Sequence, residues 1–311
     1  MERSTGKNTK PLKTVRQIAW LPVWYLKNVV KGAHQPLVTV LFLTDHCNLA
    51  CRHCAREGHA GTVMKSWKQI TRELRAAYDR GARFLDLEGG EPTIWRDGCL
   101  GINDVIDLAK EIGFFSVTVT TNGQRPFQGL KADSIWVSVD GYREVHDAIR
   151  GEGAFQRLHQ NILRSGHPAL SINMTVNREN YRSVADVLRY GKAHPGIRSV
   201  SVNFHTPYPG TEHLMPDAKI RNRVIDLVLA MKRRGYPVMN SVSGLQLMRD
   251  GNFQKECWIS EFVLNNGIRL ATCPGRSYGI CDRCGFSMAG EMHAVVHLKP
   301  DTLLAGMKLR V

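Results

Sequence analysis

Three cysteines in one short loop constrain this chain more than any other feature. Cys47, Cys51 and Cys54 are separated by three and then two residues, so one loop can turn their thiolates toward a common centre. An apolar run at 37–43 precedes the loop and predicts a buried strand that delivers it. Iron–sulfur clusters use cysteine ligands, and three thiolates leave one iron of a cluster open. Three unrelated buried cysteines or a partial zinc site are the alternatives, although zinc usually takes four ligands.

A second motif lies one strand and one helix further along the chain. Residues 88–92, Glu-Gly-Gly-Glu-Pro, follow a strand-like run at 83–87. The two motifs together resemble the signature of radical S-adenosylmethionine (SAM) enzymes, over about residues 36–290. The resemblance implies a 4Fe–4S cluster on Cys47, Cys51 and Cys54, with SAM chelating the fourth iron. It also implies that the turn of Gly89, Gly90 and Glu91 holds the methionine amino group, since glycine permits close backbone approach.

The chemistry that this resemblance implies is reductive. One electron from the cluster would cleave SAM to methionine and a 5′-deoxyadenosyl radical, which then abstracts hydrogen from a substrate or adds to it.

Five further residues match SAM-binding positions of the family by their place in the sequence. Asn122 ends the third expected strand, and Ser138 and Asp140 match a Ser-x-Asp at the end of the fourth. Arg150 resembles an arginine that pairs with the methionine carboxylate, which suits a guanidinium fork. His53 takes the place where the family's backbone meets adenine. For each of them the alternative is a turn residue, a helix cap or a surface ion pair.

The middle of the chain alternates between strand and helix patterns. Strands are expected at 37–43, 83–87, 115–120, 134–139, 170–176 and 199–204, and helices at 66–81, 102–112, 153–165, 180–190 and 217–235. Parallel neighbours need helical crossovers, so this order predicts an α/β fold with a parallel sheet. The resemblance specifies a partial (β/α)6 barrel of the TIM type, whose sites lie at the carboxyl ends of the strands.

A cysteine-rich extension follows the expected barrel. Cys257, Cys273, Cys281 and Cys284 are separated by 15, 7 and 2 residues. The set resembles the auxiliary 4Fe–4S sites of family members with a SPASM or twitch extension; a structural zinc is the main alternative. Three regions are therefore expected: a basic tail and helix at 1–35, the barrel at 36–235 and the extension at 236–311. The remaining cysteine, Cys99, is expected to be a buried thiol, with a radical-quenching hydrogen donor as the alternative.

Charge and cysteine content limit the compartment and the partners. The chain has a formal net charge of +14, which favours acidic partners, such as flavodoxin or ferredoxin as electron donor. No specific nucleic-acid module is visible. Eight cysteines without a secretory signal indicate metal ligands and a cytoplasmic protein.

The segment 15–31 predicts a helix that Pro22 kinks or restarts. It combines Trp20, Trp24 and Tyr25 with several cations, which is typical of an interfacial helix and of peripheral membrane contact. The alternative is a helix whose aromatic side chains pack on the barrel.

The substrate is open at this point. The layout resembles the hopanoid-pathway member that adds an adenosyl group to a polyprenoid, which implies a lipid substrate. A peptide-modifying enzyme of the twitch type is the second interpretation. A non-enzymatic module that binds metal clusters is the third, and the intact cysteine and Gly-Gly-Glu-Pro motifs count against it.

Overall fold

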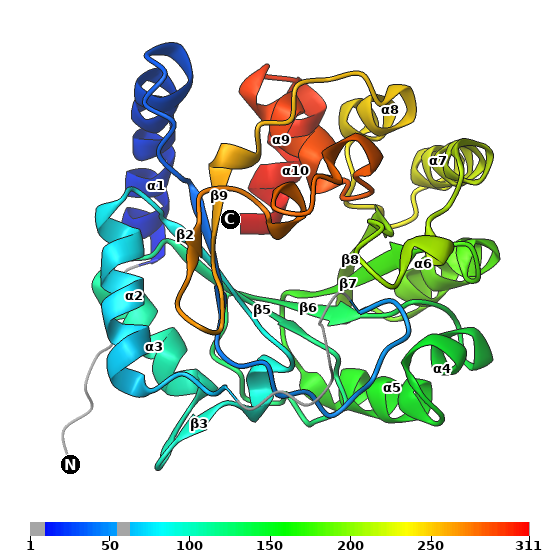
Figure 1. The fold of residues 1–311 in the computed structure, drawn as a ribbon, viewed down its shortest axis with the longest axis horizontal. Coiled ribbons are helices and arrows are strands. Elements are labelled where there is room, and N and C mark those ends of the chain that lie inside the picture. Colours follow the sequence, from blue (N-terminus) through cyan, green and yellow to red (C-terminus); the bar gives the residue numbers. More distant parts are fainter. Residues whose placement is uncertain (1–9, 55–62, 311) are drawn as a thin grey trace.

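A computed structural model describes residues 10–54 and 63–310 of the chain. Its centre is a curved eight-stranded sheet in the order β10-β9-β1-β2-β5-β6-β7-β8, with helices along its outer side (Figure 1). From β9 to β8 every neighbouring pair of strands is parallel. The α/β fold is thus confirmed as a partial TIM-type barrel with a cysteine-rich extension.

All six expected strands are present. They are β1 (Val38–Phe42), β2 (Phe84–Glu88), β5 (Ser116–Thr121), β6 (Ser134–Ser138), β7 (Leu170–Val176) and β8 (Ile197–Phe204). The helices that follow them in the chain are α2 (Trp67–Asp79), α3 (Ile102–Ile112), α4 (Glu144–Arg150), α5 (Ala154–Ser165), α6 (Val184–Ala193) and α7 (Ala218–Arg233). Short 3-10 turns occur at Pro92–Ile94, Tyr181–Ser183, Glu212–Leu214, Cys257–Ile259, Pro274–Arg276 and Cys281–Arg283.

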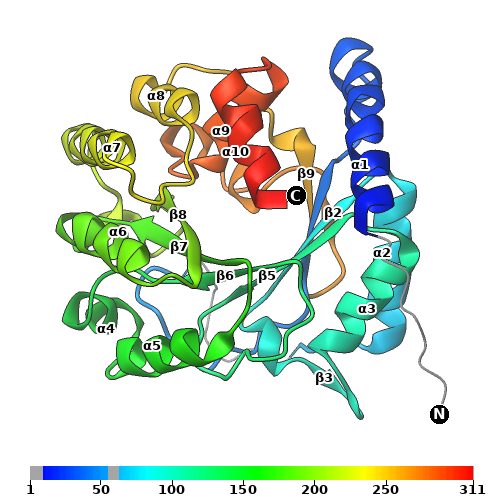
Figure 2. The same cartoon turned by 180° about the vertical axis from the view of Figure 1, so that it is seen from behind.

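The two faces of the sheet differ in chemistry because side chains alternate along a strand. The face toward the helices is aliphatic, with Leu85 and Leu87 of β2 buried in the hydrophobic core. The opposite face, which lines the inside of the barrel, carries polar side chains such as Asp86 and Glu88 of the same strand. Figure 2 shows the helices from behind, wrapped around the aliphatic face. The outer face of the sheet is therefore covered by apolar packing, and its inner face is polar.

The extension contributes to the same sheet, which the sequence analysis missed. β9 (Ser260–Val263) pairs parallel with β1, and β10 (Arg269–Leu270) pairs antiparallel with β9. β9 was not predicted from the sequence because a glutamate, Glu261, occupies a buried position in the strand. Its carboxylate accepts hydrogen bonds from Arg80, Arg269 and the Thr39 hydroxyl, which balance its charge. The chain thus returns to the first strand before it reaches the last three cysteines.

Three short helices complete the extension beside the open edge of the barrel (Figure 1). They are α8 (Val242–Asp250), α9 (Met288–Val296) and α10 (Pro300–Arg310). The buried carboxylate of Glu291 in α9 accepts hydrogen bonds from the backbone N–H and hydroxyl of Ser241, the residue that caps α8. This contact ties α8 and α9 together.

The N-terminal helix packs on the protein through its aromatic side chains. α1 (Lys10–Tyr25) continues as a π-helical turn (Leu26–Val30), so Pro22 lies within one continuous helical segment. Trp24 is 5% exposed and stacks on Trp258. The Tyr25 hydroxyl donates to the Val296 carbonyl at 2.7 Å. The aromatic rings of Trp24 and Tyr25 therefore pack on the protein, as the alternative to an interfacial helix proposed.

Among the described residues, no helix combines the length and the apolar character that crossing a bilayer requires.

Candidate active site

The three cysteines of the first motif meet at the carboxyl end of β1. Cys47, Cys51 and Cys54 are half-buried thiols around a cavity of about 170 Å³. The strand directs the loop there, and a turn in which the Cys54 N–H donates to the Cys51 carbonyl at 3.0 Å folds it back. The other residues that line the cavity are Leu49, His53, Glu88, Gly89, Gly90, Glu91, Thr120, Thr121, Asn122, Ser138 and Arg150.

The electrostatics of the loop disfavour free thiolates. Burial raises the pKa of Cys51, Arg150 opposes the rise, and Asp140, Cys54 and Cys47 add to it, so that the pKa is about 11. Ligand thiolates therefore require a strong positive charge in the cavity, and the irons of a cluster would supply it. No three His, Cys, Asp or Glu side chains of residues 10–54 and 63–310 form a group that could hold a single metal ion.

The Gly-Gly-Glu-Pro turn is built directly onto the cysteine loop. Gly89 has a φ of +155°, and a Cβ atom there would lie 2.5 Å from the Thr44 carbonyl oxygen, so only glycine fits. The Gly90 N–H donates to that same carbonyl at 2.7 Å, and the Glu91 N–H donates to the His46 carbonyl at 2.7 Å. The turn and the loop thus form one rigid wall of the cavity.

Glu91 fixes this wall to the next strand. Its side chain is fully buried, and Oε1 accepts from the Thr93 N–H and hydroxyl and from the Thr121 hydroxyl. Oε2 accepts from the Asn122 N–H at 2.7 Å. Burial raises the pKa of Glu91, and these hydrogen bonds oppose the rise. The carboxylate therefore organises the turn through protein donors.

Asn122 lies against the first cysteine. Its Nδ2 donates to Asn48 Oδ1 at 2.8 Å and lies 3.6 Å from the Sγ of Cys47. Asn122 therefore borders both the cysteine loop and the cavity.

A buried charge network lies under the loop, and it unites three of the predicted residues. Arg150 Nε is 2.5 Å from Asp140 Oδ2, and His53 Nε2 is 3.5 Å from the same oxygen. Burial opposes ionisation of Asp140, but Arg150 outweighs it, helped by His53, by His146 of α4 and by the Thr175 N–H. The pKa of Asp140 is therefore lowered. Burial lowers the pKa of His53 to about 4, which leaves the ring neutral at pH 7. The network therefore holds the side chains of Arg150 and His53 in place below the cysteine loop.

The inner wall of the barrel supplies residues that motif reasoning missed. Glu88 and Thr120 line the cavity, as does the predicted Ser138. Burial, and then Asp86, raises the pKa of Glu88 to about 7, whereas a hydrogen bond from Thr120 opposes the rise. Strand alternation was the available signal, because these residues occupy the polar positions of β2, β5 and β6.

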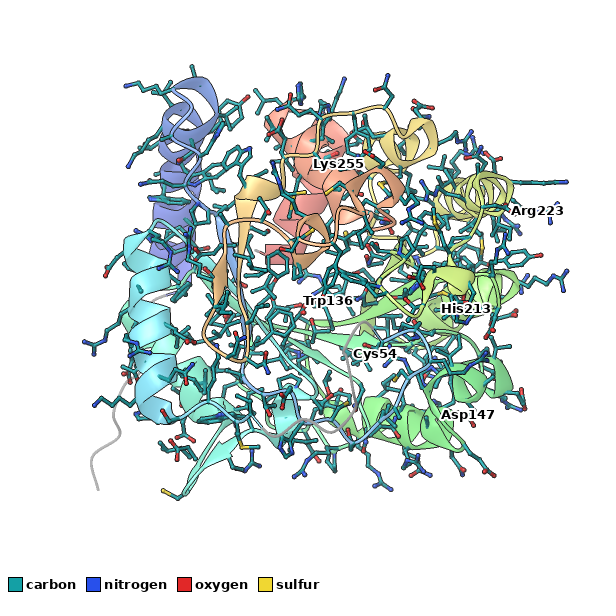
Figure 3. The ribbon with its side chains drawn as sticks, viewed as in Figure 1. Cys54, Trp136, Asp147, His213, Arg223 and Lys255 are labelled. Carbon is teal, nitrogen blue, oxygen red and sulfur yellow. The ribbon has the colours of Figure 1, made fainter. Side chains whose placement is uncertain are left out.

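Polar side chains continue around the barrel from these positions. Asn203 Nδ2 donates to Asn173 Oδ1 at 2.8 Å between β8 and β7, and Ser171 and Ser199 are hydrogen-bonded at 2.9 Å. Figure 3 shows Trp136 near the centre of the molecule, close in that view to Cys54. The inner face of the sheet therefore offers hydrogen-bonding side chains on β7 and β8.

The four cysteines of the extension interact with one another. Cys257, Cys273, Cys281 and Cys284 are half-buried and free, and each of the other three raises the pKa of Cys257. The Cys257 thiol hydrogen-bonds Cys273, which lowers the pKa of Cys273 to about 6. Arg276 contributes to that lowering. The four cysteines therefore form one sulfur-rich site, in which Cys273 ionises more readily than Cys257.

This second site is attached to the end of β8. The Phe204 N–H donates to the Gly285 carbonyl at 2.8 Å, and the Gly285 N–H donates to the Thr206 hydroxyl at 3.1 Å. A Cβ on Gly285 would lie 2.4 Å from the Phe204 carbonyl oxygen. Next to this contact, the His205 ring packs edge-on against His53, with 6.4 Å between centroids. The two cysteine sites thus lie on the same side of the barrel.

Cys99 belongs to neither site, and its expected burial is wrong. It is exposed, in the turn of a two-stranded ribbon formed by β3 (Arg96–Asp97) and β4 (Leu100–Gly101). The ribbon projects from the molecule (Figure 1), so its turn has no core to enter.

Comparison with known proteins agrees with the two motifs. Residues 41–191 match the sequence model of the radical SAM superfamily. The chain is 32% identical over 155 residues to a probable GTP 3′,8-cyclase of Saccharolobus islandicus, covering 46% of this chain and 48% of that protein. It is 28% identical over 162 residues to the mycofactocin maturase MftC of Mycolicibacterium smegmatis, covering 48% and 40%. The chain spans about half the length of the curated relatives it matches.

The fold also resembles that of solved structures. SuiB of Streptococcus suis bound to S-adenosylmethionine superposes with a TM-score of 0.65 and 19% identity, over 94% of this chain and 72% of SuiB. SuiB bound to the precursor peptide SuiA gives a TM-score of 0.60 at 17% identity, over 87% and 66%. The similarity covers the barrel and most of the extension.

Proposed function

Residues 41–191 form a radical SAM domain, and on this premise we propose that the chain is an enzyme that cleaves SAM reductively and acts on a polar substrate. The carrying observation is that three thiols, a glycine turn and Asn122 line or border one cavity. When bound there, a 4Fe–4S cluster and SAM supply one-electron cleavage to methionine and a 5′-deoxyadenosyl radical.

The residues of the first site have distinct tasks in this proposal. Cys47, Cys51 and Cys54 would hold three irons of the cluster, and the Gly89–Gly90 turn would bind the methionine amino group of SAM. Glu91 acts as a positioning residue, because its oxygens are occupied by four protein donors. Arg150 keeps Nη1 3.8 Å from Cys51 Sγ, where its charge stabilises the thiolate.

His53, Asp140 and Ser138 support the same site. Asp140 holds the guanidinium of Arg150 in place, and the neutral His53 borders the cavity, where it can contact the adenine of SAM. Ser138 faces the cavity from the end of β6 and can hydrogen-bond a bound nucleoside.

The four cysteines of the extension hold a second 4Fe–4S cluster in this proposal. Their mutual effects on pKa and the Cys257–Cys273 hydrogen bond support a shared site. An all-cysteine set also suits zinc, so metal content decides between them.

The barrel interior supports a polar substrate more than a polyprenoid. Carboxylates on β2 and amides on β7 and β8 line it, and covering these polar groups with an apolar chain would cost free energy because they would lose contact with water. Asp86 and Glu88 favour a substrate with hydrogen-bond donors or a positive charge. A peptide that the enzyme modifies is the preferred substrate class, because a peptide has hydrogen-bond donors and can carry a positive charge. An acidic electron donor such as flavodoxin or ferredoxin suits the net charge of +14.

Anaerobic turnover tests the proposal. Reconstituted enzyme with dithionite and SAM should form 5′-deoxyadenosine, and a substrate of the correct class should accelerate its formation. The probes are a lysine-rich peptide pool, GTP and a polyprenoid such as squalene. Acceleration by squalene alone would overturn the polar assignment, and absence of any 5′-deoxyadenosine would overturn the activity itself.

A further inference from the structure

One face of α1 and its π-helical turn is apolar and exposed. Val23, Leu26 and Val30 are 63%, 51% and 65% exposed, and Ala19 and Pro22 are exposed as well. Residues three, four and seven apart share one side of a helix, so these five form a continuous surface, here called the apolar stripe.

The stripe cannot turn toward the core, because the opposite face of the helix is held by the protein. Trp24 stacks on Trp258, and Trp20 packs edge-on against Phe115 at 5.4 Å. The Tyr25 hydroxyl adds its hydrogen bond to the Val296 carbonyl. Figures 1 and 2 both show α1 at one edge of the molecule. The stripe is thus a rigid outward surface.

The charges on the segment that carries the stripe have one sign. Lys27 and Lys31 are exposed next to it. In the sequence, the stretch from Arg3 to Thr44 contains seven lysines and arginines and no aspartate or glutamate. A second copy of the chain would bring these charges against their own kind, so self-association through the stripe is disfavoured. An anionic surface complements them.

We propose that the apolar stripe docks on an anionic lipid bilayer, with Val23, Leu26 and Val30 at the headgroup boundary and Lys27 and Lys31 against the lipid anions. Apolar side chains on one helix face with lysines beside them are how interfacial helices bind. Each cation near an anionic surface strengthens binding about five-fold at moderate salt. Few residues take part, so binding is reversible and salt-sensitive. This contact is independent of the proposed reaction.

Cosedimentation of the full chain with vesicles tests the docking. The vesicles contain either phosphatidylcholine alone or phosphatidylcholine with 30% phosphatidylserine, across a salt series. The stripe variant is Val23→Ser/Leu26→Gln, and the charge variant is Lys27→Gln/Lys31→Gln. Leu163→Gln is the matched control, since Leu163 is 62% exposed on α5, on the other side of the molecule (Figure 1).

The wild type and Leu163→Gln should bind the vesicles that contain phosphatidylserine and not those of phosphatidylcholine alone. The bound fraction should fall as the salt concentration rises. The stripe variant should lose about ten-fold in partitioning, and the charge variant about five-fold per lysine. All variants should retain the melting temperature and the rate of 5′-deoxyadenosine formation, which separates this contact from the reaction. The proposal is overturned if the wild type does not bind anionic vesicles, or if the stripe variant binds them as strongly as the wild type does. A dimer that the stripe variant abolishes, without vesicle binding, overturns it in favour of a second copy.

Discussion

Arg150 Nη1 lies 3.8 Å from the Sγ of Cys51, while Nε of the same guanidinium is 2.5 Å from Asp140 Oδ2. One side chain therefore links the cysteine loop to a carboxylate that is completely buried. Removing the guanidinium affects both partners, because the Asp140 charge stays buried and the thiol loses the cation that favours its ionised form.

The first prediction concerns this ion pair. Arg150→Met should lower the free energy of unfolding of the metal-free protein by about 3–5 kcal/mol, because a buried carboxylate loses its partner. Urea denaturation under reducing conditions measures the change. Arg52→Met is the matched control: its pair with Glu179 is exposed and should contribute less than about 1 kcal/mol. Equal losses in the two variants would contradict the assigned role of burial.

A second prediction concerns acid stability. His146 is buried, its Nδ1 accepts the Asp140 N–H, and burial lowers its pKa from 6.5 to about 4. Between these values the unfolded chain binds more protons than the folded one. The stabilisation is thus complete above pH 6.5 and is lost as the pH falls toward 4.

His146→Gln should therefore flatten the dependence of the unfolding free energy on pH. Between pH 7.5 and 5.0 the wild type should lose about 2 kcal/mol more than this variant, as the shift implies over that interval. His213→Gln, at an exposed histidine, should behave as the wild type does. Parallel profiles for His146→Gln and the wild type would count against a neutral buried ring.

The third prediction concerns how the extension is attached. Gly285→Ala would place a methyl group 2.4 Å from the Phe204 carbonyl oxygen and 2.6 Å from that of His205. Overpacking of this kind should cost about 1–3 kcal/mol and expose the extension to protease. Gly196→Ala has no atom within 4 Å of the new Cβ and serves as control. Identical proteolysis of both variants would show that the extension is held elsewhere.

The fourth prediction concerns metal content. Anaerobically reconstituted protein should carry about eight irons, two clusters of four. The triple Cys47/Cys51/Cys54→Ala variant should retain about half of them on Cys257, Cys273, Cys281 and Cys284. Four irons with one zinc in the wild type would instead identify the extension as a structural zinc site.

The sequence predicted the parts of this molecule in which local pattern and tertiary environment agree. The six strands of the barrel are apolar toward the helices, and their period is visible without a structure. β9 was missed because Glu261 occupies a buried strand position. Its charge is balanced there by Arg269 and by Arg80 and Thr39, two residues that are far from Glu261 in the sequence. This balancing of a buried charge by distant residues exists only in the folded chain, so the local sequence does not reveal it.

The same limit applied to the site. The cysteines and Gly89 were found because their spacing and type are unusual. Glu88 was passed over, since a glutamate at the end of a strand acquires meaning only when curvature of the sheet turns it toward the cysteines. Cys99 was misassigned because an unpaired cysteine carries no local signal of exposure.

The most direct test of the central claim is reductive cleavage of SAM by single-cysteine variants. Under dithionite, the wild type and Cys99→Ala should form 5′-deoxyadenosine at equal rates, because Cys99 lies in the exposed ribbon turn away from the cavity. Cys51→Ala should form none, since three thiolates are needed to hold the cluster. Formation of 5′-deoxyadenosine by Cys51→Ala at the wild-type rate would contradict the account.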